Sequence, residues 1–128
     1  MPRAKQLTVW VSDRPGRLGE IGAALGAKKV NIRALMATTE GGRGAVRLVV
    51  DKTAAAKKVC AGMGWETTEE EVLTVTLTDN PGTLGKVSKK LGLAGVNIQY
   101  VYAGPGGGKR ANVYMGVSDI KAALKAAR

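Results

Sequence analysis

The sequence contains an internal repeat, and this repeat restricts the possible fold more than any other feature. Residues 7–32 align with residues 73–98 without a gap. The matched positions include a strand-like alternation, an Asp-x-Pro-Gly-x-Leu turn, a run with helical periodicity and a Val-Asn-Ile tripeptide. We infer two copies of one folding unit. A unit of about sixty residues buries only about 60% of its unfolded surface, so the copies are expected to pack together and against a second chain.

In each copy, the turn stands between a strand and a helix. Alternating apolar residues before each turn predict a strand, and apolar residues at i, i+3 and i+7 after it predict helices over residues 16–27 and 82–94. We expect Asp13 and Asp79, or the residues just after them, to cap these helices, with the proline at the first helical position. The glycine then leaves backbone N–H groups uncovered, which suits a carboxylate or phosphate.

The remaining periodicities extend each copy to a β-α-β-β-α order. Glycine-rich hairpins are expected at residues 40–44 and 104–108. This order is typical of ferredoxin-like split βαβ units, which are α+β folds with antiparallel sheets and helices on one face. We predict two such domains, residues 1–70 and 71–128, the second without a last strand. Its free edge stays open, is covered by the terminal helix, or is completed by another segment or subunit.

An acidic cluster lies where the two copies join. We predict a fourth strand over residues 65–71 and a separate first strand of the second copy over residues 72–78. The carboxylates are expected to form a solvated edge that discourages edge-to-edge pairing. The cluster consists of Glu66, Glu69, Glu70 and Glu71.

The composition argues against an enzyme. The chain has no histidine and one cysteine, which removes the commonest general base and any two-thiolate metal site. The acidic cluster has no nitrogen or sulfur companions for a metal, and the glycine-rich hairpins lack the P-loop pattern. We therefore predict a non-catalytic protein without cofactor or metal, in which Cys60 is an inert buried thiol.

A net charge of +10 raises nucleic-acid binding by a ferredoxin-like module as the alternative function. The basic residues are dispersed over helices, helix ends and a hairpin, however, which favours a solvated surface. The aromatic candidates for RNA recognition are only Tyr100, Tyr102 and Tyr114. No apolar run fits a signal peptide or a membrane span, so the expected compartment is the cytoplasm.

The repeated turn, followed by a helix and then Val-Asn-Ile, is similar to the signature of ACT domains, which are small amino-acid-binding regulatory modules. The motif occurs in residues 13–18 with 30–32 and again in residues 79–84 with 96–98. The resemblance implies domains side by side with continuous sheets. It also implies that an amino acid binds where one domain's turn meets a neighbour's second strand. Without an attached enzyme domain, the chain resembles a stand-alone sensor, and the absent last strand departs from the family's pattern.

Amino-acid chemistry agrees with this resemblance. The amides after each glycine can bind a carboxylate, and Asp13 and Asp79 or backbone carbonyls can accept from an ammonium group. Asn31 and Asn97 can bridge both groups, although turn-closing is an alternative role for them and helix capping for the aspartates. The expected partners are a small aliphatic amino acid, a second copy of the chain, and an unidentified regulated enzyme or transporter. The predicted ligand-binding residues are Asp13, Arg14, Gly16, Arg17, Leu18, Asn31, Ile32, Asp79, Asn80, Gly82, Thr83, Leu84, Asn97 and Ile98.

Overall fold

The computed structural model describes residues 3–127. Its contacts divide the chain into two compact units. The first unit consists of residues 5–70. The second unit consists of residues 71–127 together with Arg3 and Ala4. Each unit is described by itself.

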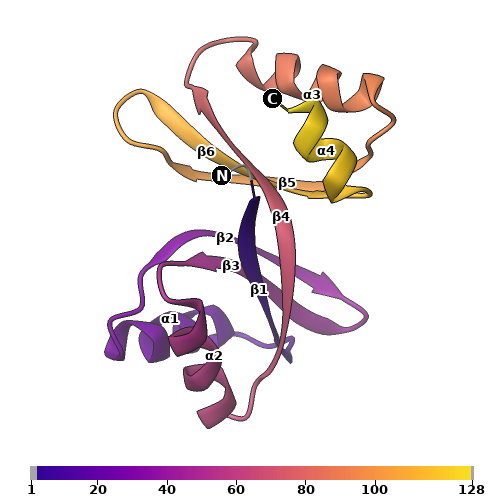
Figure 1. The fold of residues 1–128 in the computed structure, drawn as a ribbon. Helices are drawn as coiled ribbons and strands as arrows, with labels where there is room; N and C mark the ends of the chain where they lie inside the picture. The colour runs from indigo at the N-terminus through magenta and orange to yellow at the C-terminus, as the bar shows by residue number, and fades with distance from the viewer. Residues whose placement is uncertain (1–2, 128) are drawn as a thin grey trace. The chain divides into compact units, whose positions relative to one another are not determined.

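The first unit is an antiparallel sheet with two helices on one face. Its strand order is β2-β3-β1-β4, and β3 pairs antiparallel with both β1 and β2. The two helices lie on the same side of these strands (Figure 1). Its elements are β1 (Arg3–Ser12), α1 (Arg17–Ala27), β2 (Ile32–Glu40), β3 (Arg43–Val50), α2 (Thr53–Gly62) and the first part of β4 (Glu66–Thr78).

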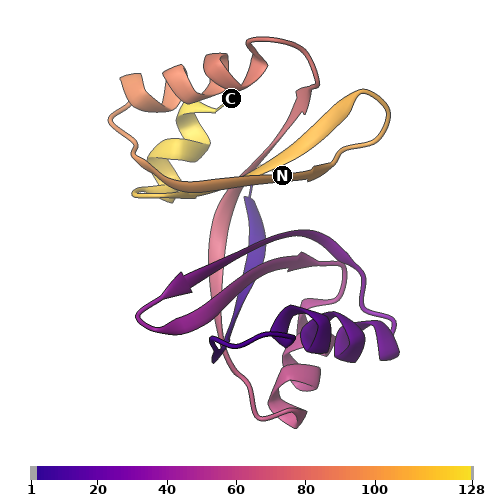
Figure 2. The ribbon, with the colours of Figure 1, turned by 180° about the vertical axis from the view of Figure 1, so that it is seen from behind.

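The second unit repeats this arrangement with the second part of β4. Its strand order is β4-β6-β5, and β6 pairs antiparallel with both neighbours. Both helices again lie on one side of the strands (Figure 2). The predicted α+β class with antiparallel strands is therefore confirmed. Its further elements are α3 (Thr83–Leu93), β5 (Ile98–Pro105), β6 (Arg110–Val117) and α4 (Ile120–Ala126).

Each unit has its own apolar core between helices and strands. Leu25 on α1 and Leu91 on α3, which are equivalent positions of the repeat, are both 0% exposed. Cys60 is buried in the first core, and burial raises the pKa of its thiol. The predicted apolar stripe is wrong at its first position, because Leu18 and Leu84 remain 45% and 48% exposed.

The helices after the two turns begin at glycine, not at aspartate. Gly16 and Gly82 hold the N-cap positions of α1 and α3 with φ of 91° and 88°, and neither cap has a side-chain hydrogen bond. The prediction that Asp13 and Asp79 cap these helices is therefore wrong, as is the first helical position for the proline. Glycine adopts this left-handed conformation without a Cβ penalty, so the turn closes one residue after the proline.

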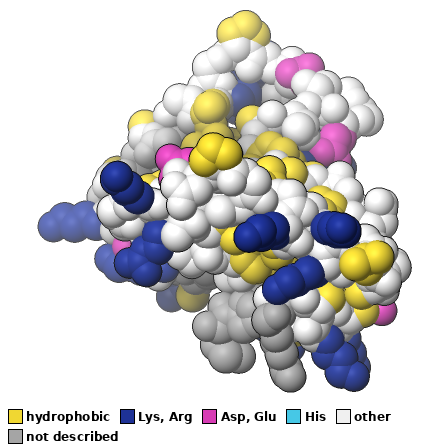
Figure 3. All heavy atoms as spheres, turned by 90° about the horizontal axis from the view of Figure 1, so that it is seen from above, with side chains coloured by type: hydrophobic (Ala, Val, Ile, Leu, Met, Phe, Trp, Pro, Cys, Tyr) yellow, Lys and Arg dark blue, Asp and Glu magenta, His cyan; other side chains and the backbone are white. Residues whose placement is uncertain are grey.

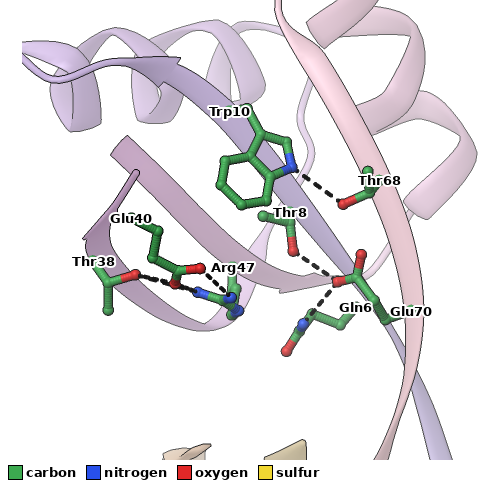
Figure 4. A network of polar contacts seen from close by, with 8 residues as sticks. All are labelled: Gln6, Thr8, Trp10, Thr38, Glu40, Arg47, Thr68 and Glu70. Atoms are coloured by element: carbon green, nitrogen blue, oxygen red, sulfur yellow. Dashed lines mark hydrogen bonds and ion pairs between the residues drawn. The ribbon is translucent and has the colours of Figure 1, made fainter. Parts of the chain in front are cut away.

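The acidic cluster lies on one unbroken strand, β4, where two separate strands were predicted. The predicted solvated edge is wrong for Glu70, which accepts hydrogen bonds from Gln6 Nε2 (2.9 Å) and Thr8 Oγ1 (2.7 Å) (Figure 4). Gln6 and Thr8 are 0% and 2% exposed, and buried polar groups need such partners. Glu66 contacts Arg43 at 3.1 Å, Glu69 contacts Lys57 at 3.7 Å and Glu71 contacts Arg3 at 2.8 Å.

The start of β1 lies at the free edge of the second unit. Among the described residues, no strand follows α4. Arg3 and Ala4 belong to this unit, β1 neighbours β4 in the strand order, and Arg3 Nη1 donates to Glu71 Oε2. Another segment of the same chain therefore occupies part of the edge.

Acid should selectively remove one polar contact of the first unit. Glu40 accepts from both Arg47 Nη nitrogens, at 2.6 and 3.2 Å, and from Thr38 Oγ1 at 2.7 Å (Figure 4). Hydrogen bonds from Arg47 and then Thr38 lower the pKa of Glu40 from 4.5 to about 2. A depressed carboxyl pKa stabilises the fold fully above pH 4.5, and this contribution disappears as the pH falls through about 2.

The free energy of unfolding at pH 6 should therefore be larger for the wild type than for Glu40→Gln. This difference should shrink as the pH falls from 4.5 towards 2. Urea unfolding across this pH range measures it. Glu66→Gln is the control, since its ion pair with Arg43 is exposed and contributes little. A difference between wild type and Glu40→Gln that does not change with pH would contradict the assignment.

Candidate functional site

A pocket of about 390 Å³ lies at the first Asp-x-Pro-Gly turn. The turn forms one wall, the N-terminal end of α1 a second, and the facing parts of β2 and β3 the rest. All of these residues belong to the first unit. They are Val11, Ser12, Asp13, Arg14, Gly16, Arg17, Leu18, Ala37, Thr38, Thr39, Gly44 and Val46.

The second unit has a pocket of about 380 Å³ at its own turn. It lies between the N-terminal end of α3 and the facing parts of β5 and β6. Its lining residues are Leu77, Thr78, Asp79, Asn80, Gly82, Thr83, Leu84, Val101, Tyr102, Ala103, Ala111 and Val113.

Strand register shows that the two pockets are equivalent. Val11 pairs with Gly44 in the first unit, and Leu77 pairs with Ala111 at the same place in the second. Ala37 pairs with Val46, as Ala103 pairs with Val113. The repeat seen in the sequence therefore reproduces the same concave surface twice.

Side-chain hydrogen bonds stabilise each turn in a different way. In the first unit, Arg17 donates to Ser12 Oγ from Nε (3.1 Å) and Nη2 (2.7 Å), and to Glu20 Oε2 from Nη1 (2.8 Å). The hydrogen bond from Arg17 is the main cause that lowers the pKa of Glu20. In the second unit, Thr83 Oγ1 lies within hydrogen-bond distance of the carbonyl oxygens of Thr78 and Asn80, at 2.9 and 3.1 Å.

The predicted asparagines lie away from the pocket of their own unit. Asn31 is exposed before β2, where its N–H donates to Asp51 Oδ1 (2.9 Å) and its carbonyl accepts from the Asp51 N–H (3.1 Å). Asn97 forms the equivalent pair with Ser118, at 3.0 Å for both bonds. Six residues of strand separate Asn31 from Ala37, or about 20 Å. In the arrangement that the ACT resemblance implies, each asparagine would instead reach the pocket of a neighbouring domain.

Ile32 and Ile98, the last two predicted site residues, pack partly buried against the cores of their units. Sequence reasoning identified the turn side of both pockets and missed the strand side. Alternation predicted the strands themselves, but no sequence signal fixed the register that brings these residues opposite the turn. The missed residues are Val11, Ser12, Ala37, Thr38, Thr39, Gly44, Val46, Leu77, Thr78, Val101, Tyr102, Ala103, Ala111 and Val113.

Exposed apolar side chains flank both pockets at equivalent positions. Leu18 and Leu84 line the pockets and are 45% and 48% exposed. Leu35 on β2 and Val101 on β5 are 41% and 43% exposed. Both strands are the last of their unit in the strand order. Large apolar groups repeated beside a pocket on an edge strand mark a surface that a partner can cover.

Other chemistry finds less support in the structure. Tyr102 and Tyr114 stack on each other at 5.5 Å and are 9% and 5% exposed, so their rings are not open to bases. Lys and Arg side chains are separated by apolar and uncharged groups over the face in Figure 3. Residues 3–127 contain no cluster of three or more potential metal ligands. None of the helices in that range is long and apolar enough to cross a membrane.

A protein-family model matches the part of the chain that contains the first turn. Residues 5–58 match the family model of the ACT domain. The resemblance inferred from the turn motif is thereby confirmed for the first copy. No curated protein sequence matches the chain.

Solved structures are similar in fold over nearly the whole chain, which includes both units. Protein BT0572 from Bacteroides thetaiotaomicron is 26% identical, with a TM-score of 0.88 over 98% of this chain and 86% of that one. The regulatory subunit of aspartate kinase from Thermus thermophilus is 18% identical, with a TM-score of 0.66 over 95% and 89% of the chains. Its counterpart from Thermus flavus is 16% identical, with a TM-score of 0.63 over 99% and 91%. The chain has an ACT-like α+β fold.

Proposed function

Starting from the ACT match over residues 5–58, we propose that this chain is a non-catalytic regulatory protein that binds a small amino acid at its turn pockets. We further propose that it is a tandem of two ACT-like domains, residues 1–70 and 71–128, and that it regulates an enzyme or transporter in trans. The observation that carries the proposal is the pair of equivalent pockets. The regulatory subunits of aspartate kinase with a similar fold support the regulatory role.

The pocket chemistry suits the backbone of an amino acid. The first N–H groups of a helix have no carbonyl partner four residues earlier within that helix and carry the positive end of the helix dipole, although the Thr83 N–H of α3 donates to the Asn80 carbonyl oxygen at 3.4 Å. Gly16 and Gly82 add no side chain there, so a carboxylate can approach the amides. Asp13 and Asp79 line the same pockets and can accept from the ligand's ammonium group.

A second copy of the chain completes the site in this proposal. Antiparallel pairing of two edge strands, centred on Leu35 or Val101, carries the asparagine before one strand to the far end of the facing strand. The first pocket lies at that end, at Ala37–Thr39, and the second extends from the centre of its strand towards that end, at Val101–Ala103. The exposed leucines and valine become covered in the same contact, which also removes an open sheet edge.

Removing the asparagine side chains should therefore weaken ligand binding without unfolding the chain. Asn31→Ala and Asn97→Ala should each lower the binding free energy by about 1–3 kcal/mol, because a buried ligand group loses its partner. Titration calorimetry measures the affinity. The matched control is Asn112→Ala, whose side chain instead contacts Pro105 and Thr76 within the second unit. Unchanged affinity in both single variants and the double variant would return both asparagines to a turn-closing role.

Thermal-shift screening against the twenty amino acids tests the proposed function, with light scattering to measure the oligomeric state. At least one amino acid should raise the melting temperature, because a ligand that binds only the folded state stabilises it. The chain should elute as a dimer. A monomer whose melting temperature responds to none of the twenty would contradict the proposal.

A further inference from the structure

The two pockets are equivalent in backbone but differ in side chains at two turn positions. Arg14 and Arg17 line the first pocket where Asn80 and Thr83 line the second. Among the lining residues of the second pocket, the charged one is Asp79. The first pocket therefore combines one carboxylate with two guanidinium groups, whereas the second carries one carboxylate and no cation.

Arg17 is held in a fixed orientation at the first pocket. Ser12 accepts from two of its nitrogens and Glu20 from the third, and the side chain is 21% exposed. A guanidinium has five N–H groups, so these contacts leave donors for a ligand. Because the planar group is already oriented, it can bind a carboxylate through parallel, charge-assisted hydrogen bonds with little further ordering.

Glu20 offsets part of the Arg17 charge, and Asp13 and Arg14, which carry opposite charges, are neighbours on the same turn. The positive and negative charges of the side chains at this pocket therefore nearly cancel. Oriented N–H donors remain there, and carboxylates do not outnumber them. A side-chain carboxylate brought into this pocket meets Arg14 and Arg17 and is not simply repelled by Asp13.

The second pocket lacks such donors. The Thr83 hydroxyl is directed at carbonyl oxygens of its own turn, at 2.9 and 3.1 Å. The strand side is apolar, through Val101, Ala103 and Val113. Lys86, which stands where the first unit has Glu20, is not among the residues of this pocket. It lines an adjoining groove, which shares Leu77, Thr78 and Thr83 with the pocket. A ligand carboxylate in the second pocket would face Asp79 without a compensating cation.

Resting on the proposed function, we propose that the two pockets take different classes of amino acid. The first binds an amino acid with a side-chain carboxylate, with Arg17 as its specificity-determining residue. The second binds an amino acid with a neutral, apolar side chain. The full chain therefore responds to two effectors.

Titration calorimetry on the full chain tests this, with glutamate and leucine as the probes. Both should bind, and saturation with one should leave the affinity for the other unchanged. Arg17→Thr copies the residue of the second unit into the first. It should weaken glutamate binding by roughly 10- to 100-fold, the loss expected for hydrogen bonds to a charged group, and leave leucine binding as in wild type.

Two further variants separate specificity from charge and folding. Lys58→Thr makes the same charge change at an exposed position on α2, outside both turn pockets and away from the edge strands, and it should leave both affinities as in wild type. Arg17→Lys keeps the charge but loses the planar fork, so it should retain only part of the glutamate affinity. The melting temperature of each variant shows that it is folded.

The outcomes distinguish the two proposals. Loss of glutamate binding confined to Arg17→Thr supports the inference. Competition between glutamate and leucine, or equal weakening of both by Arg17→Thr, would overturn it while leaving an amino-acid sensor in place. An equal effect of Lys58→Thr on glutamate binding would reduce the inference to a general charge effect and overturn it as well. If none of the twenty amino acids bound, the result would contradict the proposed function itself.

Discussion

Replacing Leu25 with alanine should lower the free energy of unfolding of the first unit by about 3 kcal/mol. The side chain is fully buried between α1 and the strands, and leucine-to-alanine changes in such positions cost about 2–5 kcal/mol through lost burial and the cavity left behind. Leu91→Ala should have an effect of the same size on the second unit, because it occupies the equivalent position in the second core.

The chain provides a separate optical probe for each unit. Both tryptophans, Trp10 and Trp65, lie in the first unit, whereas all three tyrosines lie in the second. In urea, Leu25→Ala should shift the tryptophan-detected transition and Leu91→Ala the tyrosine-detected one. Leu93→Ala is the control, since that side chain is 81% exposed and should shift neither. If Leu91→Ala moved the tryptophan transition as far as the tyrosine one, the two copies would not be separate folding units.

Placing glutamate at both Leu35 and Val101 should convert the chain from dimer to monomer. Each side chain is exposed in the chain by itself, at 41% and 43%, and sits at the centre of an edge strand that the proposed dimer covers. Removing an apolar group at the centre of an interface costs about 2 kcal/mol or more, and an unpaired charge buried there costs further. We expect the dimer dissociation constant to rise by at least roughly 100-fold. Light scattering over a dilution series measures it.

Amino-acid affinity should fall together with dimerisation, because the pocket then loses the asparagine of the partner subunit. The control is Leu93→Glu, which adds one such charge at a more exposed leucine at the end of α3. If the variant with both Leu35→Glu and Val101→Glu stayed dimeric, the interface would lie elsewhere. One that became monomeric with unchanged affinity would make each pocket complete within a single chain.

Much of the fold was predictable because the repeat presents each signal twice. The alternating strand and the stripe through Ile21 and Leu25 both led to the observed elements and core. Helix starts were misjudged because aspartate and proline are good capping signals, whereas a glycine with positive φ becomes visible only when the turn is built. β4 was divided in two because its charged first half and apolar second half differ in composition, although both halves are extended.

The candidate site was predictable only on its turn side. The Asp-x-Pro-Gly motif identified the residues around Gly16 and Gly82, but the facing strand residues depend on hairpin register. Asn31 and Asn97 follow the helix in sequence, yet the pocket begins farther along the strand, about 20 Å from Asn31 and about 13 Å from Asn97. In the proposed dimer a second copy completes the site, and residues brought together in that way cannot be grouped from the order of one chain.

Hydrogen exchange with and without the best amino-acid ligand from the thermal-shift screen tests the central claim most directly. Backbone amides report protection residue by residue, so binding, interface and turn can be separated in one measurement. We predict slower exchange at both Asp-x-Pro-Gly turns, around Asn31 and Asn97, and along the edge strands β2 and β5. Protection that rose at neither turn, or on surfaces remote from both pockets alone, would contradict an amino-acid sensor built on these two sites.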